Sequence, residues 1–337
     1  MPAVNLIDVT RTFQNDDDCL AYLETMRWPN GIRCPLCGCT DISKIKRKSS
    51  TVTRKKADGS TREHKQRTRI YQCLEPTCKQ QFSATAGTIF NDSHLPLTKW
   101  FMALAIIVDA KKSISAKQLQ QHLGIGSYRT AWYMAHRIRK SMVDSDPMPM
   151  SGVVEIDETY IGGTAKRRFK RAKEPKAPKE IVMAMRERST PEKPGRVRYF
   201  HLPNAKQATI QPLIDKHVSQ DVEAIYTDAA TVYDFTINED HRDKHAAVNH
   251  SIQWIVPGTR VHTNTVENSF TLLKRGLIGS FHRVSIKHLH RYLTEFEYRF
   301  NARKAADRFT MTLANMLGTD AMPYAALTAN PEPEEVF

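Results

Sequence analysis

The sequence predicts an α/β protein in which a mixed β-sheet with helices is preceded by a small cysteine-rich module and a short helical region. Three observations support this fold class. Apolar, β-branched runs of strand length alternate with segments of helical spacing in the carboxy-terminal half. Two close cysteine pairs lie in the first quarter of the chain. Between these regions, two helical patterns flank a Gly-Ile-Gly turn.

Charge indicates the kind of partner. The chain has 337 residues, and 50 Lys and Arg against 36 Asp and Glu give a net charge of +14. Such an excess is typical of nucleic-acid binders. The amino terminus lacks the basic start and apolar core of a signal peptide, and no apolar run is long enough to span a bilayer. We therefore expect a soluble, intracellular protein without a membrane partner.

The six cysteines are expected in a reducing compartment, where close pairs favour metal binding over disulfides. A short helix in residues 1–30 precedes them. Cys34 and Cys37 form one pair and Cys73 and Cys78 the other, which supplies the four thiolates of a tetrahedral structural zinc site. Cys39 could replace Cys37 as a ligand. The alternative to a zinc site is that these are unrelated buried cysteines. The basic interval from 44 to 69 has almost no apolar residues and is predicted to be a solvated loop or a hairpin.

Residues 97–111 are strongly apolar and predict a mostly buried helix. Helices over 115–123 and 127–140, joined by the Gly-Ile-Gly turn, then have the outline of a helix-turn-helix. An ordinary helical hairpin that only packs is the alternative. DNA binding is favoured because basic residues stand where phosphate contacts are expected, and these are Arg129, Arg137, Arg139 and Lys140. A Pro- and Asp-rich stretch at 144–149 marks a domain boundary.

Beyond the boundary, the element order predicts an RNase H-like mixed sheet. The expected elements are strands over 153–161, 180–187 and 196–202, a helix over 206–218, a strand ending at 228, a helix, a strand near 245–249 and a helix around 267. A very basic loop at 166–179, with Arg167 and Arg168, lies between the first two of these strands.

Three acids in this domain stand in settings that suit a divalent-metal site. Asp157 lies in a strand, Asp228 ends another strand, and Glu267 lies on a helix. Hard cations such as Mg²⁺ prefer oxygen ligands, and two such ions about 4 Å apart can bind the attacking and leaving oxygens of a phosphoryl transfer. Read one by one, these acids would be turn, capping or solvated residues, but together they favour a metal site.

The third ligand is open at this stage. Asn264 lies one helical turn before Glu267 on the same face, so either could reach the metal. A carboxylate binds Mg²⁺ better than an amide, which favours Glu267. Glu155, Glu158 and Asp234 are further acids nearby.

Lys274 follows Glu267 by two turns on the same face, and Arg275 stands beside it. Each is either a solvated charge or a contact that holds a phosphate of DNA over the metals. His262 and His282 are ambiguous in the same way, and we do not expect a histidine metal ligand here.

These motifs together resemble a known family. They are Cys34-Pro-Leu-Cys37, the segment Gln81 to Phe90, Glu155-Ile-Asp157-Glu158-Thr-Tyr-Ile-Gly162-Gly163, Tyr226-Thr-Asp228, His262-Thr-Asn264-Thr-Val-Glu267 and Lys274-Arg275-Gly276. In this order they resemble the bacterial insertion-sequence transposases that join an amino-terminal zinc ribbon to a DDE, integrase-like domain. The resemblance covers roughly residues 20–305. It departs from the family in the wide basic interval between the cysteine pairs.

The resemblance implies a domain order and a set of ligands. The domains are an amino-terminal helical segment at 1–30, a zinc ribbon with a basic insertion at 31–92, a helix-turn-helix region at 93–146, an RNase H-like catalytic domain at 150–305, and a carboxy-terminal helix with a disordered tail at 306–337. Asp157, Asp228 and Glu267 would bind Mg²⁺ or Mn²⁺, with Asn264 as the alternative third ligand. Lys274 would contact DNA, and Zn²⁺ would be structural.

The implied activity is stepwise phosphoryl transfer on double-stranded DNA. Water activated at one Mg²⁺ would attack a phosphodiester at a terminal inverted repeat, and the freed 3′-hydroxyl would then attack target DNA while the second metal steadies the leaving oxygen. We expect a homodimer or higher assembly on DNA in the bacterial cytoplasm, associated with the nucleoid. The alternatives are a zinc-ribbon regulator without catalysis and an RNase H-like nuclease without strand transfer.

Overall fold

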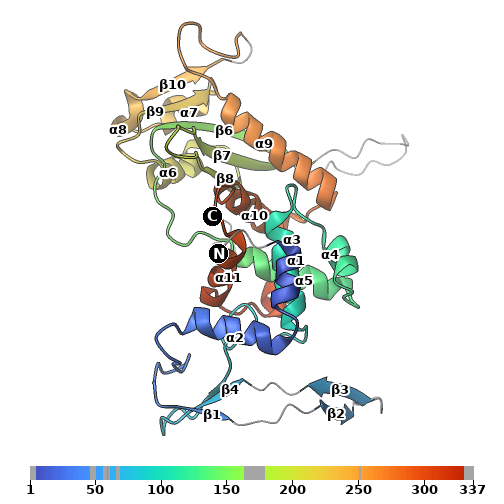
Figure 1. The fold of residues 1–337 in the computed structure, drawn as a ribbon. Helices are drawn as coiled ribbons and strands as arrows, with labels where there is room; N and C mark the ends of the chain where they lie inside the picture. Colours follow the sequence, from blue (N-terminus) through green and yellow to red (C-terminus); the bar gives the residue numbers. More distant parts are fainter. Residues whose placement is uncertain are drawn as a thin grey trace, which may run out of the picture. The chain divides into compact units, whose positions relative to one another are not determined.

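The computed structural model describes residues 5–45, 51–55, 59, 61–65, 69–162, 179–249 and 252–329 (Figure 1). The chain forms two compact units. The first, here called the ribbon-helix unit, comprises residues 1–110, 116–141 and 306–328. The second, the sheet unit, comprises residues 111–115, 142–305 and 329–337. No helix in the described part of the chain is long and apolar enough to cross a membrane.

The ribbon-helix unit begins with two helices where the sequence predicted one. α1 spans Leu6–Thr12 and α2 spans Asp16–Arg27. The reason is two successive capping boxes: the side chains of Asn5 and Asn15 each accept hydrogen bonds from the first turn of a helix. The second cap stops α1 from continuing into α2.

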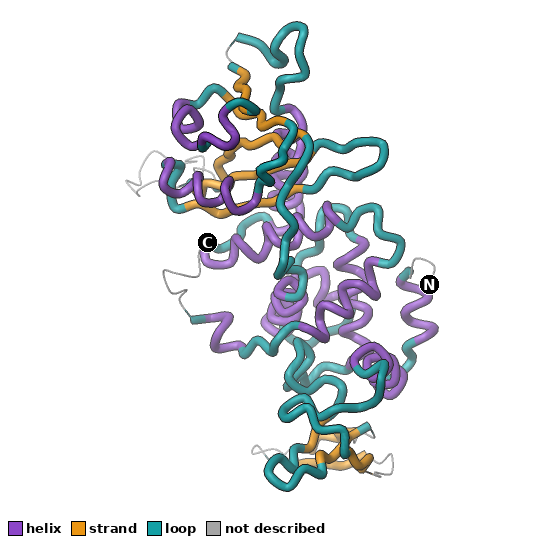
Figure 2. Tube along the Cα trace, turned by 90° about the vertical axis from the view of Figure 1, so that its left-hand side faces the viewer, coloured by secondary structure: helices purple, strands orange, loops and turns teal. Residues whose placement is uncertain are grey.

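The strands of this unit form a small sheet and a hairpin. β1 (Ile42–Ile45), β4 (Ile70–Cys73) and β5 (Gln81–Phe82) pair in the order β1-β4-β5, and both pairings are antiparallel. β2 (Thr51–Lys55) and β3 (Thr61–Lys65) pair antiparallel with each other. The basic interval between the cysteine pairs is therefore a hairpin, one of the two forms predicted for it. Within this unit, these strands lie beyond the helices, next to α2 (Figures 1 and 2).

The helices of the same unit include the two that were predicted to form a helix-turn-helix, α4 (Ala116–His122) and α5 (Tyr128–Lys140). α3 spans Leu97–Asp109. The chain returns to this unit at its carboxy-terminal end with α11 (Arg308–Gly318) and α12 (Tyr324–Thr328). The tail predicted to be disordered falls largely on 330–337, outside the described residues.

The sheet unit contains one five-stranded mixed sheet. Its strands are β6 (Val153–Ile161), β7 (Glu180–Glu187), β8 (Val197–Leu202), β9 (Ala224–Asp228) and β10 (His245–Val248). Their order is β10-β9-β6-β7-β8. β9 runs parallel to both β10 and β6, whereas β7 is antiparallel to β6 and β8. This arrangement is the RNase H-like sheet that the element order predicted. The basic loop with Arg167 and Arg168 lies outside the described residues.

Helices cover both faces of this sheet. α6 (Gln207–His217) and α7 (Thr231–Thr236) pack on one face, which buries Ile156, Met183 and Met185. α9 (Asn264–Gly276) and α10 (Leu289–Asn301) pack on the other face, against Val182 and Ala184 (Figure 1). Alternation along the strands divides these residues between two cores. The short elements of this unit are α8 (Glu239–Arg242), a π-helical turn at Leu277–Phe281 and a 3₁₀ turn at Ile286–His288.

Candidate metal centres and DNA-contacting residues

The two cysteine pairs meet in the ribbon. The sulfur atoms of Cys34, Cys37, Cys73 and Cys78 all lie within 4.8 Å of one another. Sγ of Cys34 is 3.7 Å from Sγ of Cys78, and Sγ of Cys37 is 3.6 Å from Sγ of Cys73. A tetrahedron with Zn–S bonds of about 2.3 Å has edges of about 3.8 Å, so these spacings fit a zinc ion with four thiolate ligands. Such a closed site is structural.

Cys39 and Cys19 have other roles. The Cys39 sulfur accepts a hydrogen bond from the Asp41 amide at 3.3 Å and does not belong to the cluster of four. Cys19 lies fully buried on α2 and is a core residue. The ribbon also has a small aromatic core, in which Trp28 packs edge-on to Tyr71 and Phe82 with ring centroids 6.1 and 5.8 Å away.

In the sheet unit, one face of β6 carries the candidate catalytic residues. Glu155, Asp157 and Thr159 alternate along the strand and therefore share one face. They stand opposite Arg186, Ala184 and Val182 of β7, and Ala184 and Val182 belong to the core under α9. The three residues interact with successive parts of α9. Glu155 contacts the amide of Val266, the charge of Glu267 acts on Asp157, and Thr159 contacts Lys274.

Asp157 and Asp228 are neighbours across two parallel strands. Glu155 of β6 is paired with Tyr226 of β9. Asp157 and Asp228 each follow this pair by two residues, so they belong to the same face of the sheet, and the charge of Asp228 acts on Asp157. Asp228 ends β9, and its Oδ1 accepts a hydrogen bond from the Ala230 amide at 3.2 Å. The turn after the strand thus fixes the direction of this carboxylate.

The charges of neighbouring acids act on Asp157. Burial raises the pKa of Asp157 to about 8, and repulsion from Asp228, Glu158 and Glu267 adds to the rise, against a hydrogen bond from the Glu158 amide that lowers it. The negative charges of Asp228 and Glu267 therefore act on the same point. Among the described residues, the group of possible metal ligands whose atoms all lie within 4.8 Å of one another consists of the four cysteine thiols. The three carboxylates do not form such a group.

Glu267 and Asn264 differ in their surroundings. Glu267 is partly buried in the first turns of α9, and its Oε1 accepts a hydrogen bond from the Thr263 hydroxyl at 3.3 Å. Asn264, the first residue of the helix, is exposed. Glu267 is also the member of this pair whose charge acts on Asp157. These facts favour Glu267 as the third ligand.

Glu155 is not a free ligand, because both its carboxylate oxygens are engaged. It is fully buried, and its Oε2 accepts hydrogen bonds from the backbone amides of Thr265 and Val266, both at 2.8 Å. Its Oε1 pairs with Nε of Arg188 at 2.6 Å. Glu155 thus caps the amino-terminal end of α9, where a negative charge is favoured by free amides and by the helix dipole. Sequence reasoning counted Glu155 only as a nearby acid and missed this role.

Arg188 extends the same cluster. Its Nη1 donates to the carbonyl of Arg260 at 2.9 Å and its Nη2 to the carbonyl of His262 at 3.0 Å, while its guanidinium lies 4.8 Å from the ring centroid of Tyr226. Nδ1 of His262 lies 2.9 Å from Nη2 of Arg188 and 3.3 Å from Oε1 of Glu155. Burial and the nearby Arg188 lower the pKa of His262, against the charge of Glu155, which raises it. His262 therefore packs with Arg188 and Glu155 at the start of α9.

Glu158 points to the other side of β6, where it accepts a hydrogen bond from the Tyr233 hydroxyl at 2.6 Å. Burial raises the pKa of Glu158, against this hydrogen bond. The buried tyrosine engages this carboxylate, which therefore has a partner other than a metal. The side chain of Asp234 lies outside the described part of the structure.

Lys274 lies on the face of α9 that carries Glu267. Its ammonium group donates a hydrogen bond to the Thr159 hydroxyl, two residues beyond Asp157 on β6. The helix therefore presents a cation on the face of β6 that carries Asp157. Arg275 is exposed on the neighbouring face of the helix.

The four basic residues predicted to contact DNA from the helix-turn-helix fall into two groups. Arg129 is exposed near the start of α5, and Lys140, partly buried, donates to the carbonyl of Asp320 at 3.1 Å. Arg137 and Arg139 are only 3% and 2% exposed. The prediction that these two arginines contact phosphates on an open helix face is therefore corrected. Other parts of the unit pack against α5 and bury more of its surface than its amphipathic pattern indicated.

The fold, the four clustered cysteines and the three acids define a class of protein: a zinc-ribbon protein with an RNase H-like domain that carries three acids, as in DNA transposases of the DDE type. Comparison with known families agrees. Residues 149–301 match the ISXO2-like transposase domain, and residues 14–81 match the transposase zinc-ribbon domain. Both are domains of insertion-sequence transposases, and together the two matches cover most of the chain.

A relative from Halobacterium salinarum is similar over most of its length. It is described as an uncharacterized protein in transposable element ISH50, and it is 29% identical over 305 residues. These residues cover 86% of this chain and 92% of the relative. The resemblance predicted from the motifs is thus confirmed at the level of the family.

Proposed function

We propose that this transposase cleaves DNA at the terminal inverted repeats of its element and joins the freed 3′ ends to target DNA, with Mg²⁺ or Mn²⁺ bound by Asp157, Asp228 and Glu267. The observation that carries the proposal is that Asp157 and Asp228 lie on neighbouring parallel strands, β6 and β9, and that α9, which carries Glu267, packs on the face of the sheet to which Asp157 belongs. A site that places like charges together gains stability from a cation.

The donor set fits a hard divalent ion. Carboxylate oxygens are the ligands that Mg²⁺ and Mn²⁺ prefer, and two of the acids come from rigid neighbouring strands. Divalent ions at such a site stabilise the charge that develops on a phosphate during strand cleavage and joining. For the ribbon, the four thiols fit Zn²⁺ as a structural ion.

The residues around the acids position DNA and the ligands. Glu155 and Arg188 hold the start of α9, and with it Glu267, against β6. Lys274 stands on the same face of the helix and would meet a backbone phosphate of the bound strand. The backbone phosphate would then lie between the ammonium group of Lys274 and the three acids.

DNA recognition is assigned to the basic surfaces. We propose that Arg129 and Lys140 of the helix-turn-helix, Arg275 on α9, and Arg167 and Arg168 of the basic loop contact the backbone of double-stranded DNA, and that the ribbon contributes to recognition of the repeats. Such contacts add affinity without reading sequence. A homodimer or higher assembly on DNA would bring the two ends of the element together.

The experiment is an assay with labelled terminal-repeat DNA, a target plasmid and Mg²⁺. The wild-type chain is expected to produce nicked ends and joined products, and Asp157→Asn to produce neither while it still binds the DNA. Nicks without joined products would identify a nuclease. A variant Asp157→Asn that loses specific DNA binding would instead favour a regulator without catalysis.

A further inference from the structure

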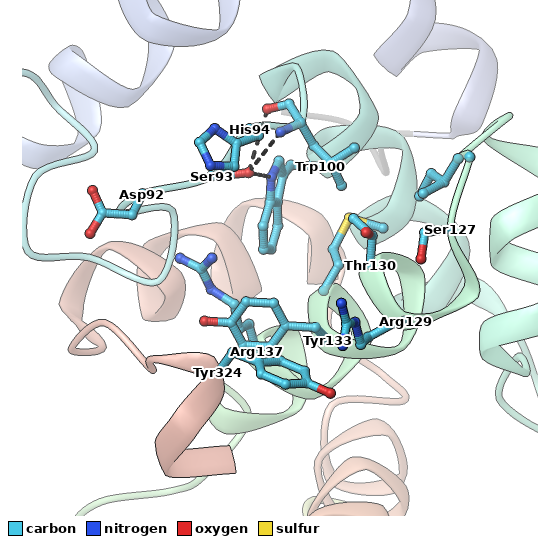
Figure 3. Close-up of a pocket in the computed structure, with 14 residues that line it drawn as sticks. Asp92, Ser93, His94, Trp100, Ser127, Arg129, Thr130, Tyr133, Arg137 and Tyr324 are labelled. Atoms are coloured by element: carbon cyan, nitrogen blue, oxygen red, sulfur yellow. Dashed lines mark hydrogen bonds between the residues drawn. The ribbon is translucent and has the colours of Figure 1, made fainter. Parts of the chain in front are cut away.

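The helix-turn-helix contains a pocket of about 460 Å³ that none of the metal centres uses. It lies between α3, the start of α5, the loop at 92–95 and α12, all in the ribbon-helix unit. Figure 3 shows Ser93 and His94 on one side of it and Arg129 and Tyr324 on the other. Its volume lies within the range of small-molecule sites in proteins.

Arg137 is the buried cation of this pocket. It is 3% exposed, and Nη2 donates to the carbonyl of Asn91 at 2.6 Å, whereas its Nε has no hydrogen-bond partner. In the described part of the chain, no carboxylate lies within ion-pair distance of its guanidinium, and the acid that attracts it from further away is Asp92. A buried guanidinium with an unpaired donor is costly. An anion in the pocket would remove that cost.

Aromatic rings surround the same cation. The guanidinium of Arg137 lies 5.1 Å from the ring centroid of Trp100 and 5.2 Å from that of Tyr133. At the rim, the guanidinium of Arg129 lies 5.4 Å from the ring of Tyr324, which is 38% exposed. Planar cations and aromatic rings are the groups on which nucleobases stack.

The amino-terminal end of α5 opens beside these groups. Ser127 is its N-cap, but no side-chain hydrogen bond caps the helix, and the hydroxyls of Ser127 and Thr130 line the pocket. Free amides at a helix start favour phosphate groups. The pocket therefore combines two arginines and a helix start, which suit a phosphate, with aromatic walls, which suit a base.

We propose that this pocket binds one nucleotide, with its phosphate at the arginines and its base against the aromatic residues. The nucleotide comes either from an unpaired position of a DNA strand or from a free mononucleotide, since both offer the same chemistry. The first source rests on the proposal that DNA is the substrate of this protein, and the second does not. An unpaired nucleotide is expected because a base inside a duplex cannot enter a pocket of this kind.

The test measures binding of the full-length chain to fluorescein-labelled duplexes by fluorescence anisotropy, without Mg²⁺. One duplex is blunt and the other has a short single-stranded overhang. Deoxyadenosine monophosphate, added as a competitor, tests the free nucleotide. Arg129→Met and Tyr324→Ala remove rim groups that are accessible to solvent, and Arg137→Lys keeps the buried charge but removes the guanidinium. Lys117→Met, an equal charge change at an exposed position of α4 outside the pocket, is the control.

The wild type is expected to prefer the overhang duplex by about tenfold, and each pocket variant to lose most of this preference while Lys117→Met keeps it. Binding of the mononucleotide that the pocket variants weaken, without an overhang preference, supports the same site with a free nucleotide as its ligand. Equal binding of both duplexes together with no competition by the mononucleotide overturns the proposal. A preference that survives all three pocket variants also overturns it. Because no strand is cleaved in this assay, these outcomes do not depend on whether the acids catalyse cleavage.

Discussion

The carboxylate of Glu155 lies 2.8 Å from the backbone amide of Val266, so a residue of β6 caps the helix that carries Glu267. On β6, Glu155 precedes Asp157 by two residues, and on α9, Val266 directly precedes Glu267. This contact, with the second one from the amide of Thr265, therefore ties the strand that carries Asp157 to the helix that carries Glu267. The ion pair of Glu155 with Arg188 holds the capping carboxylate in place.

This relationship predicts a positioning role for Glu155. The substitution Glu155→Gln leaves Arg188 with a neutral partner and is expected to lower the free energy of unfolding by about 3 kcal/mol. It is also expected to weaken Mg²⁺ binding by the folded protein, because α9 loses its anchor. Chemical denaturation and calorimetric titration with Mg²⁺ measure the two effects.

Glu187 is the matched control for that substitution. It is also a buried carboxylate, and it pairs with Arg196 at 2.6 Å on β7, but it makes no contact with α9 among the interactions described. Glu187→Gln is expected to destabilise the sheet unit and to leave the Mg²⁺ affinity of the folded protein unchanged. Equal loss of Mg²⁺ affinity in both variants would show that Glu155 has a general structural role only.

The raised pKa of Asp157 predicts how stability depends on pH. Because its pKa rises from 3.8 to about 8 on folding, the folded state binds more protons than the unfolded state between these values. In the absence of divalent ions, this group therefore contributes a stability that falls as pH rises through that window. Mg²⁺ competes with the proton, so its stabilising effect is expected to be greater near pH 8 than near pH 6. Thermal denaturation with and without Mg²⁺ measures this.

Asp157→Asn separates this carboxylate from other titrating groups. The neutral amide removes the repulsion, so the variant is expected to melt higher than the wild type near pH 8 without Mg²⁺ and to respond little to the ion. If the variant keeps the full Mg²⁺ response of the wild type, Asp157 is not a ligand.

Substitution of a zinc ligand is expected to differ in its effect from substitution of the nearby Cys39. Cys73→Ser removes a buried thiolate of the cluster and is expected to abolish zinc binding and to destabilise the ribbon, whereas Cys39→Ser retains the metal. Native mass spectrometry counts the bound ion in each variant. Zinc that is lost equally from both variants would contradict the assignment of the four ligands.

Lys274 and Arg275 are expected to differ in their effect on DNA. Lys274 lies beside the acids through its hydrogen bond to Thr159, whereas Arg275 is exposed on the adjacent face. Lys274→Met and Arg275→Met should each reduce the salt dependence of binding by about one unit of slope. Cleavage of fully bound DNA should fall much more in Lys274→Met. Equal cleavage by the two variants at saturation would place Lys274 outside the catalytic site.

Local patterns in the sequence predicted what depends on short-range chemistry. The pairing of Cys34 with Cys37 and of Cys73 with Cys78 follows from spacing, and their convergence within 4.8 Å agrees with it. The strands of the sheet follow from apolar β-branched runs, which explains why β6 and β7 were placed with their observed bounds. Both features are decided by residues close together in the chain.

Long-range contacts decided what the sequence did not predict. Glu155 caps a helix that begins about a hundred residues later, so no local pattern distinguishes it from a ligand. Arg137 looked like an exposed phosphate contact, but it packs between the rings of Trp100 and Tyr133. The segment of 306–328 returns to the same unit, where the Tyr133 hydroxyl donates to the carbonyl of Met322. A returning segment of this kind cannot be seen in the amphipathic pattern of α5.

The central claim is that Asp157, Asp228 and Glu267 together bind the divalent ions for cleavage and joining. The most direct measurement compares joined products from Asp157→Asn, Asp228→Asn, Glu267→Gln and Asn264→Ala, all saturated with terminal-repeat DNA in Mg²⁺. The account predicts that the first three variants bind DNA but yield no cleaved or joined product, and that Asn264→Ala retains activity. Cleavage by any of the three carboxylate variants at the wild-type rate, or an inactive Asn264→Ala beside an active Glu267→Gln, would contradict it.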